Sequence, residues 1–294
     1  MVAINRPRRS VLYMPGSKAR ALDKARNIAA DALIFDLEDA VAPSEKVAAR
    51  QMVVDTMAEG GYGERELIIR INGLDTEWGA EDLVAAARAA PDAILIPKTE
   101  SGQMVAFASE RIIAAGAPET TSVWAMMETP RGFLRAAEIA DAHPRLAAMV
   151  MGTNDLISEL RAEFTADRAP VQTALSMCVL AARAARIACI DGVYNAFRDD
   201  DGLRSECNAG RAMGFDGKTL IHPTQVAITN DIFGPSENEI ALAKEQVEAF
   251  AAAEAAGQGV AVVNGKIVEN LHVETAKRLI AEAEAIARLA AANS

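Results

Sequence analysis

The chain has 294 residues, of which 51% are hydrophobic and 24% are charged, and its formal net charge is −11. This composition is typical of a folded globular protein and excludes a disordered, collagen-like or disulfide-scaffold chain. Because 41 acidic residues outnumber 30 basic ones, the overall field repels nucleic acid and acidic membranes, and an anionic ligand requires a few placed Lys or Arg side chains.

The first two thirds of the chain alternate short aliphatic runs with alanine-rich stretches of helical period, a pattern typical of a parallel α/β fold. Strands are predicted at residues 10–13, 32–37, 67–72, 93–97, 122–127, 147–151, 188–191 and 217–221. Helices are predicted at residues 17–30, 43–59, 75–90, 101–116, 129–142, 170–185 and 202–213. About eight strand–helix units predict a closed (β/α)8 barrel of the TIM type. An open doubly wound sheet is the alternative, but no GxGxxG motif follows the first strand.

The pattern changes after Pro223. A helix over residues 236–256 begins at a Ser236 N-cap, Asn264-Gly265 predicts the turn of a β-hairpin, and a last helix covers residues 273–292. About 60 residues are few for an independent domain. We therefore divide the chain into a catalytic barrel, residues 1–230, and a C-terminal helical lid extension, residues 231–294, which covers the barrel or reaches a neighbouring subunit.

The cellular compartment is predicted from two features. No stretch approaches the ~18 uninterrupted apolar residues that a membrane-spanning helix needs. Cys178, Cys189 and Cys207 form no CxxC pair, and their odd number argues against a disulfide framework. We expect a cytoplasmic protein without a membrane or nucleic-acid partner.

Polar residues follow most of the predicted strands, at the end of a barrel where the strand–helix loops form the active site. Glu128 follows the fifth strand and Asp155 follows the sixth. An unpaired carboxylate at the mouth of a buried strand is costly unless it binds a cation or a basic side chain. Oxygen ligands without a His or Cys cluster predict a Mg²⁺ site, with Mn²⁺ as the other suitable ion. Ion pairs with Lys98, Lys218 or Arg70 are the alternative.

Two further strand ends carry candidate side chains. The Arg70 guanidinium can bind a carboxylate through two hydrogen bonds, and a rim salt bridge to Glu38 or Asp39 is its alternative role. His222, at the end of the last strand, is a candidate base, with a hydrogen-bonded structural role as the alternative.

The turn at residues 15–17 opens a helix, so its backbone N–H groups can receive a phosphate or carboxylate. Lys18, Arg20 and Lys24 add positive charge nearby. A Pro-Gly-Ser turn is also a routine helix N-cap, which leaves both roles open.

Several motifs, spread in order over nearly the whole chain, resemble those of one known family. They are RSVLYMPGSKARALDKA (9–25), DLEDAVAPSEKVAAR (36–50), IRIN (69–72), METPRG (127–132), GTNDL (152–156), GKTLIHP (217–223) and GKIVENLHV (265–273). The pattern resembles the citrate lyase β-subunit-like family, which includes malyl-CoA and citramalyl-CoA lyases of the HpcH/HpaI aldolase superfamily. The resemblance implies a TIM-type barrel, dependence on Mg²⁺ and a CoA-thioester substrate. It also implies a homotrimer, or a hexamer built from two trimers, in which the C-terminal extension closes over a neighbour's active site.

The same resemblance implies roles for single residues. Glu128 and Asp155 match the Mg²⁺ ligands, and Arg70 matches the catalytic residue that binds the acyl oxygens of the substrate. Malyl-CoA lyases have a tail aspartate where this chain has Glu269, one methylene longer. Glu269 either serves as the catalytic acid/base or shifts the chemistry away from the parent reaction.

The resemblance also implies contacts with the substrate or CoA. Tyr13, Lys18 and Lys24 match such positions, with Lys18 standing where the family has an arginine. Asn154 in GTNDL and His222 in GKTLIHP complete the predicted set.

The expected function is a Mg²⁺-dependent lyase that cleaves a 3-hydroxyacyl-CoA, such as (3S)-malyl-CoA or citramalyl-CoA, into acetyl-CoA and glyoxylate or pyruvate. A (3S)-malyl-CoA thioesterase on the same scaffold is one alternative. A citrate lyase β subunit that acts on an acyl-carrier-protein thioester is another. An aldolase without CoA is the last, and it leaves the basic segment from Lys18 to Lys24 without a role.

Overall fold

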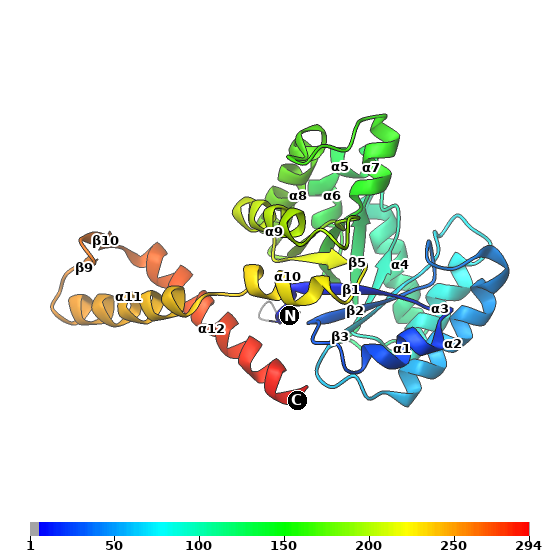
Figure 1. Cartoon of the computed structure of the whole chain (residues 1–294), viewed down its shortest axis with the longest axis horizontal. Helices are drawn as coiled ribbons and strands as arrows, with labels where there is room; N and C mark the ends of the chain where they lie inside the picture. The colour runs from blue at the N-terminus through cyan, green and yellow to red at the C-terminus, as the bar shows by residue number, and fades with distance from the viewer. Residues whose placement is uncertain (1–5, 294) are drawn as a thin grey trace. The chain divides into compact units, whose positions relative to one another are not determined.

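Eight parallel strands close into a barrel in which each strand pairs with the next and the last pairs with the first, as the computed structural model shows for residues 6–293 (Figure 1). The strands are β1 (Ser10–Pro15), β2 (Ala32–Asp36), β3 (Glu66–Arg70), β4 (Ala93–Ile96), β5 (Ser122–Met127), β6 (Leu146–Met151), β7 (Ala188–Asp191) and β8 (Gly217–Leu220). The predicted TIM-type barrel is confirmed.

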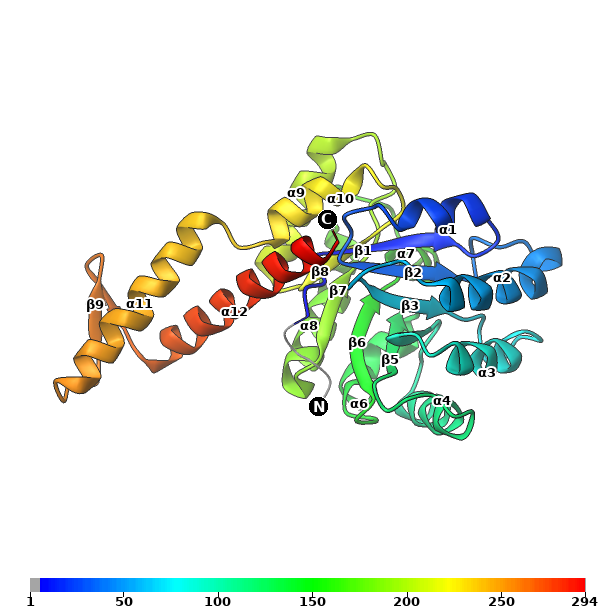
Figure 2. The same ribbon diagram turned by 90° about the horizontal axis from the view of Figure 1, so that it is seen from below.

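Helices surround the barrel, and α1, α2, α3 and α4 succeed one another around its outside in both views (Figure 1 and Figure 2). They are α1 (Ala19–Ala25), α2 (Lys46–Glu59), α3 (Gly79–Ala89), α4 (Gly102–Ala114), α5 (Pro130–Leu134), α6 (Ala136–Ala140), α7 (Thr153–Leu160), α8 (Gln172–Ala185), α9 (Asp200–Met213) and α10 (Gln225–Phe233). Short 3₁₀ turns, η1 (Pro43–Glu45) and η2 (Ala169–Val171), precede α2 and α8.

The helices differ from the prediction in three places. The helix expected at residues 17–30 is the short α1, and the one expected at 129–142 is broken into α5 and α6 around Arg135, whose φ is −111°. The helices α7 and α10 were not predicted. The first turn of α7 is polar and resembles a loop, and α10 contains β-branched residues that lower helix propensity.

Alternation along the strands builds two layers of core. Val11, Ile34, Ile68, Leu95 and Trp124 belong to a buried cluster inside the barrel. Their sequence neighbours belong to the larger cluster between the strands and the helices. A side chain at the carboxyl end of a strand therefore faces the barrel interior when it lies an even number of residues beyond an interior residue of that strand.

The contacts divide the chain into two compact units, Arg8–Phe233 and Gly234–Ala292. The second unit contains α11 (Glu237–Ala255), the hairpin of β9 (Ala261–Val263) and β10 (Lys266–Val268), and α12 (Asn270–Ala292). A capping box between Ser236 and Glu239 starts α11, and positive φ values of 49° at Asn264 and 74° at Gly265 form the predicted hairpin turn. This unit has its own small apolar core, and its role as a lid stays a prediction.

In the part of the chain that the structure describes, no helix is both long and apolar enough to cross a membrane. The three cysteines are buried and free.

Candidate functional site

The carboxyl ends of β1, β2, β3 and β5 bring four of the functional side chains into the mouth of the barrel. Asp36 pairs in register with Arg70 on the next strand. Because Ile34 and Ile68 face the barrel interior, Asp36 and Arg70 face it too, two residues further along. The ring of Tyr13 lies under the Arg70 guanidinium, 4.9 Å from ring centroid to Cζ.

Glu128 is the first residue after β5, and only 1% of its surface is exposed. Its Oε1 accepts a hydrogen bond of 2.7 Å from the backbone N–H of Lys98. Its Oε2 is buried and has no hydrogen-bond partner among residues 6–293. A buried carboxylate oxygen without a partner carries a large desolvation cost, which a bound cation would remove.

Gly152 permits the close approach of Glu128 to the next strand. A Cβ atom at Gly152 would lie 2.4 Å from Cβ of Glu128 and 2.7 Å from its Oε2. The backbone N–H of Gly152 donates to the carbonyl of Met127 over 2.8 Å. This contact joins the end of β5 to the start of α7, where the half-buried Asp155 lies in the first helical turn.

Electrostatics place the two predicted metal ligands within each other's influence. Burial raises the pKa of Glu128 to about 8, and the charges of Glu38 and Asp155 add to the shift, whereas the Lys98 N–H and Arg70 oppose it. Burial lowers the pKa of the Lys98 ammonium, but the facing carboxylates outweigh this effect and raise it. The mouth of the barrel is therefore rich in negative charge.

These residues fit a Mg²⁺ ion. In residues 6–293 no three His, Cys, Asp or Glu side chains are arranged to hold a metal, and the pairing of Glu128 with Asp155 around one ion stays a prediction. Mg²⁺ accepts one or two carboxylates and leaves its other positions to water and substrate oxygens. The free Oε2 of Glu128 is the observation that supports this fit.

Arg70 is 5% exposed and already has carboxylate partners. Nε and Nη2 each donate to Asp36 over 2.6 Å, and Nη1 lies 2.8 Å from Glu38 and 3.1 Å from Asp39. The salt bridges considered as the alternative are thus present. The predicted contact between Arg70 and the acyl oxygens of a substrate stays a prediction.

Sequence reasoning gave Asp36 no role and named Glu38 and Lys98 only as alternative ion-pair partners. Asp36 also accepts the backbone N–H groups of Glu38 and Ala40, at 2.9 and 3.1 Å, and so shapes the loop that carries Glu38. Burial raises the pKa of Glu38 to about 7, although Arg70 opposes this effect. The DLED motif directly after a buried strand was the signal that could have found them.

Lys98 takes part through its backbone as well as its charge. It has a positive φ of 46°, which is strained for a residue with a side chain. This conformation aims its N–H at Glu128, while its ammonium lies 3.9 Å from Glu38. Strain held at this position is typical of a functional loop.

The predicted CoA-binding lysines are exposed on α1. Lys18 precedes the helix and lies 4.0 Å from Glu45, and Lys24 lies in the last helical turn. Both are exposed to solvent, Lys18 beside Glu45, and neither belongs to the buried network.

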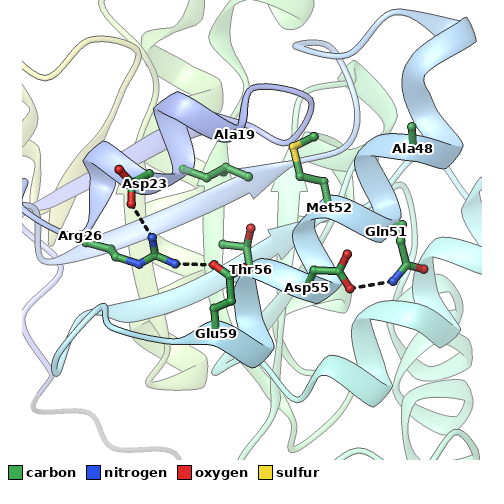
Figure 3. Close-up of a pocket in the computed structure, with 10 residues that line it drawn as sticks. Ala19, Asp23, Arg26, Ala48, Gln51, Met52, Asp55, Thr56 and Glu59 are labelled. Carbon is green, nitrogen blue, oxygen red and sulfur yellow. Dashed lines mark hydrogen bonds and ion pairs between the residues drawn. The ribbon is translucent and has the colours of Figure 1, made fainter.

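A groove of about 630 Å³ lies between α1 and α2 (Figure 3). Three carboxylates line it against one guanidinium, that of Arg26, which bridges Asp23 at 2.6 Å and Glu59 at 2.9 Å. Its net negative lining repels phosphate, so this groove does not suit the phosphate groups of CoA.

Asn154 lies in the first turn of α7, after β6, and His222 follows β8. Asn154 exchanges two hydrogen bonds with Asn195, and His222 stacks on Phe197 with ring centroids 4.6 Å apart. Lys218 pairs with Asp191 and Glu206 rather than with Glu128 or Asp155. Glu269 is exposed in the C-terminal unit, between β10 and α12.

The comparisons with known proteins agree with one another. The family profile of HpcH/HpaI aldolase/citrate lyase matches residues 9–223. The chain is 58% identical over 285 residues to the (3S)-malyl-CoA thioesterase of Cereibacter sphaeroides, covering 97% of this chain and 98% of that protein. It is 37% identical over 284 residues to the citrate lyase subunit beta of Escherichia coli, covering 95% and 94%. It also matches the crystal structure of CitE from Mycobacterium tuberculosis with magnesium, acetoacetate and coenzyme A at a TM-score of 0.75 and 31% identity, covering 94% and 97%.

Proposed function

Because the chain belongs to the HpcH/HpaI aldolase/citrate lyase family, we propose that it is a Mg²⁺-dependent thioesterase that hydrolyses (3S)-malyl-CoA. The observation that carries this proposal is the 58% identity to the (3S)-malyl-CoA thioesterase of Cereibacter sphaeroides over almost the full length of both chains. It supports hydrolysis, the alternative of the sequence analysis, better than the lyase reaction expected there.

In this proposal Glu128 and Asp155 hold the ion. The bound Mg²⁺ would supply a Lewis acid for the oxygens of the acyl group. Burial of Glu128 and the N–H of Lys98 at 2.7 Å orient the carboxylate before the ion arrives. A preorganised ligand of this kind loses little freedom on binding.

Arg70 and the basic residues bind the substrate. Asp36 fixes the plane of the Arg70 guanidinium through two hydrogen bonds, which leaves it rigid at the mouth of the barrel. We assign it the malyl carboxylate or carbonyl oxygen, for which a planar donor is suited. Tyr13 supports its face, and the exposed Lys18 and Lys24 bind the phosphates of CoA.

Hydrolysis requires one water molecule. Its oxygen bonds to the thioester carbonyl carbon and the C–S bond then breaks, so CoA leaves as a thiolate that takes up a proton while malate is released. Glu269 is the proposed base that accepts the proton of this water. Its carboxylate is exposed in the C-terminal unit and is available to an adjacent site.

We further propose that the C-terminal unit closes over the barrel of a neighbouring copy in a homotrimer or hexamer. The hairpin exposes Val262 at 67% and Ile267 at 61%, although both are strongly apolar. Apolar side chains exposed together on one hairpin favour contact with another protein surface.

The lyase reaction is the second candidate, with cleavage of (3S)-malyl-CoA or citramalyl-CoA. The 37% identity to the citrate lyase subunit beta of Escherichia coli supports it. Both reactions share the ion and Arg70, and they differ in whether water attacks the carbonyl or a C–C bond breaks.

Product analysis separates the two candidates. The purified protein is incubated with (3S)-malyl-CoA and MgCl₂, and the products are separated by chromatography. Free CoA and malate in equal amounts support the thioesterase, whereas acetyl-CoA and glyoxylate support the lyase. EDTA should abolish either reaction, and full turnover with EDTA present would contradict the metal assignment.

A further inference from the structure

The loop that follows β7 contacts the first turn of α7, which carries Asp155. Gly192 packs so closely on Thr153 that a Cβ atom would lie 2.6 Å from its Oγ1. Three residues further on, Asn195 Nδ2 donates to Asn154 Oδ1 over 2.8 Å, and Asn154 Nδ2 donates to Asn195 Oδ1 over 3.2 Å. Two neighbouring residues of α7 are thus held by one loop.

The first turn of α7 needs such support. Its N-cap residue is Gly152, which offers no side-chain cap, and the helix runs only from Thr153 to Leu160. Uncapped helix starts fray because their first N–H groups have no partner. The two hydrogen bonds between Asn154 and Asn195 therefore restrain the first turn of α7, which has no N-cap side chain to restrain it.

A buried ion network anchors the loop at its other end. Asp191, the last residue of β7, receives the backbone N–H of Gly192 over 2.8 Å. It also pairs with Arg168 at 2.7 Å and with Lys218 at 3.2 Å, and Lys218 contacts Glu206 at 2.5 Å. Asp191 and Lys218 are fully buried.

This network is balanced and rigid. It contains two cations and two carboxylates, and each of its hydrogen bonds joins elements that follow one another around the barrel. Nη2 of Arg168 is buried without a hydrogen-bond partner in the described chain, but Nη1 and the other contacts still hold these elements in one arrangement. The loop of residues 192–195 thus starts from a fixed point and ends on Asn154.

We propose that Asn195 is a positioning residue for the metal site, acting through Asn154 to hold the first turn of α7 and with it the carboxylate of Asp155. The inference rests on the proposed Mg²⁺ site but not on the proposed reaction. Side chains that orient metal ligands contribute about 10- to 100-fold to metal affinity. Because Asn195 is one residue removed from the ligand, the lower end of this range is expected.

Binding of Mn²⁺ alone tests this inference without any substrate. The full-length protein is titrated with Mn²⁺, and the free ion is followed by electron paramagnetic resonance. We expect Asn195→Ala to weaken binding about tenfold. Because the Asn195 side chain is exposed, the melting temperature of the variant should stay within about 2 °C of that of the wild type.

A double-mutant cycle identifies the route of the effect. If Asn195 acts through Asn154, then Asn195→Ala should have no further effect in an Asn154→Ala background. Additive losses of affinity in the double variant would overturn the positioning role.

Arg183→Met is the matched control. Arg183 on α8 pairs with Asp216 at 2.8 Å just before β8, at the opposite end of the strands. Its loss should leave Mn²⁺ affinity unchanged. Equal Mn²⁺ affinity for wild type and Asn195→Ala would overturn this inference alone, whereas a wild type that binds no Mn²⁺ would overturn the metal assignment as well.

Discussion

Two ion networks of the same barrel differ in their charge balance. The first lies inside the mouth, with Arg70 and Lys98 facing five carboxylates, Asp36, Glu38, Asp39, Glu128 and Asp155. The second lies outside the strands, with Arg168 and Lys218 facing Asp191 and Glu206. The first has a formal charge of −3 and the second has none.

We relate this difference to a proposed binding site in the mouth and a structural brace outside the strands. The neutral network holds as many cations as carboxylates, and it stabilises one arrangement of β7, β8 and α9. The network in the mouth leaves one buried oxygen of Glu128 without a partner in the described chain. Uncompensated negative charge held in a fixed position is the state that a divalent cation neutralises.

The sharpest test of this comparison is Asp155→Asn. It keeps the shape of the side chain but removes a charge from the negative network, so metal-dependent turnover of (3S)-malyl-CoA should fall by more than about 100-fold. Far-ultraviolet circular dichroism should remain unchanged. Full activity in this variant would refute the metal assignment.

Glu128→Gln should remove the stabilisation by MgCl₂ and change the pH dependence of the melting temperature. In the metal-free protein burial raises the pKa of Glu128 to about 8 from an ordinary 4.5. The folded state then binds this proton more tightly than the unfolded state, so the associated stability is lost as pH rises through about 8. Between pH 7 and pH 9 the melting temperature of the metal-free wild type should fall by about 4 °C.

In Glu128→Gln this fall should be smaller, because Glu38, with its pKa of about 7, still contributes to it, and MgCl₂ should no longer raise the melting temperature at pH 9. Differential scanning fluorimetry with EDTA or MgCl₂ measures both effects. The same fall in wild type and variant would show that another group causes it.

Arg168→Met tests the neutral network. The substitution leaves Asp191 and Glu206 facing Lys218 alone, and breaking a buried ion pair costs about 3 kcal/mol. Urea unfolding measures this loss of stability. A change below about 0.5 kcal/mol, as for an exposed pair, would contradict its role as a brace.

Lys18→Ala should have the smallest effect. Lys18 is exposed and lies 4.0 Å from the exposed Glu45, so it contributes a point charge to an anionic ligand. We expect KM for the CoA ester to rise about threefold with unchanged kcat, and the difference to shrink in high salt. Arg88→Ala on α3 is a control with an equal change of charge, and an equal rise there would contradict a specific phosphate contact.

The barrel and the hairpin of the extension were predicted from local signals. Aliphatic runs at regular spacing set the strands, and Asn264-Gly265 set the turn because both residues take a positive φ there. The helix α7 was missed because its first turn, Thr153 to Asp155, is polar. Its helical form depends on packing against α5 and η2 and on the β7 loop, which local propensity does not report.

The sequence by itself determined the fold class and the positions of the acidic and basic residues at the strand ends, because hydrophobic period and strand alternation are written in consecutive residues. Only the tertiary structure decided which of those charges meet. Asp36 pairs with the guanidinium of Arg70, Asp191 pairs with Lys218, and Oε2 of Glu128 has no hydrogen-bond partner in the described chain. These partners lie 27 or more residues apart in the chain, and the pairing of β2 with β3 and of β7 with β8 brings them together.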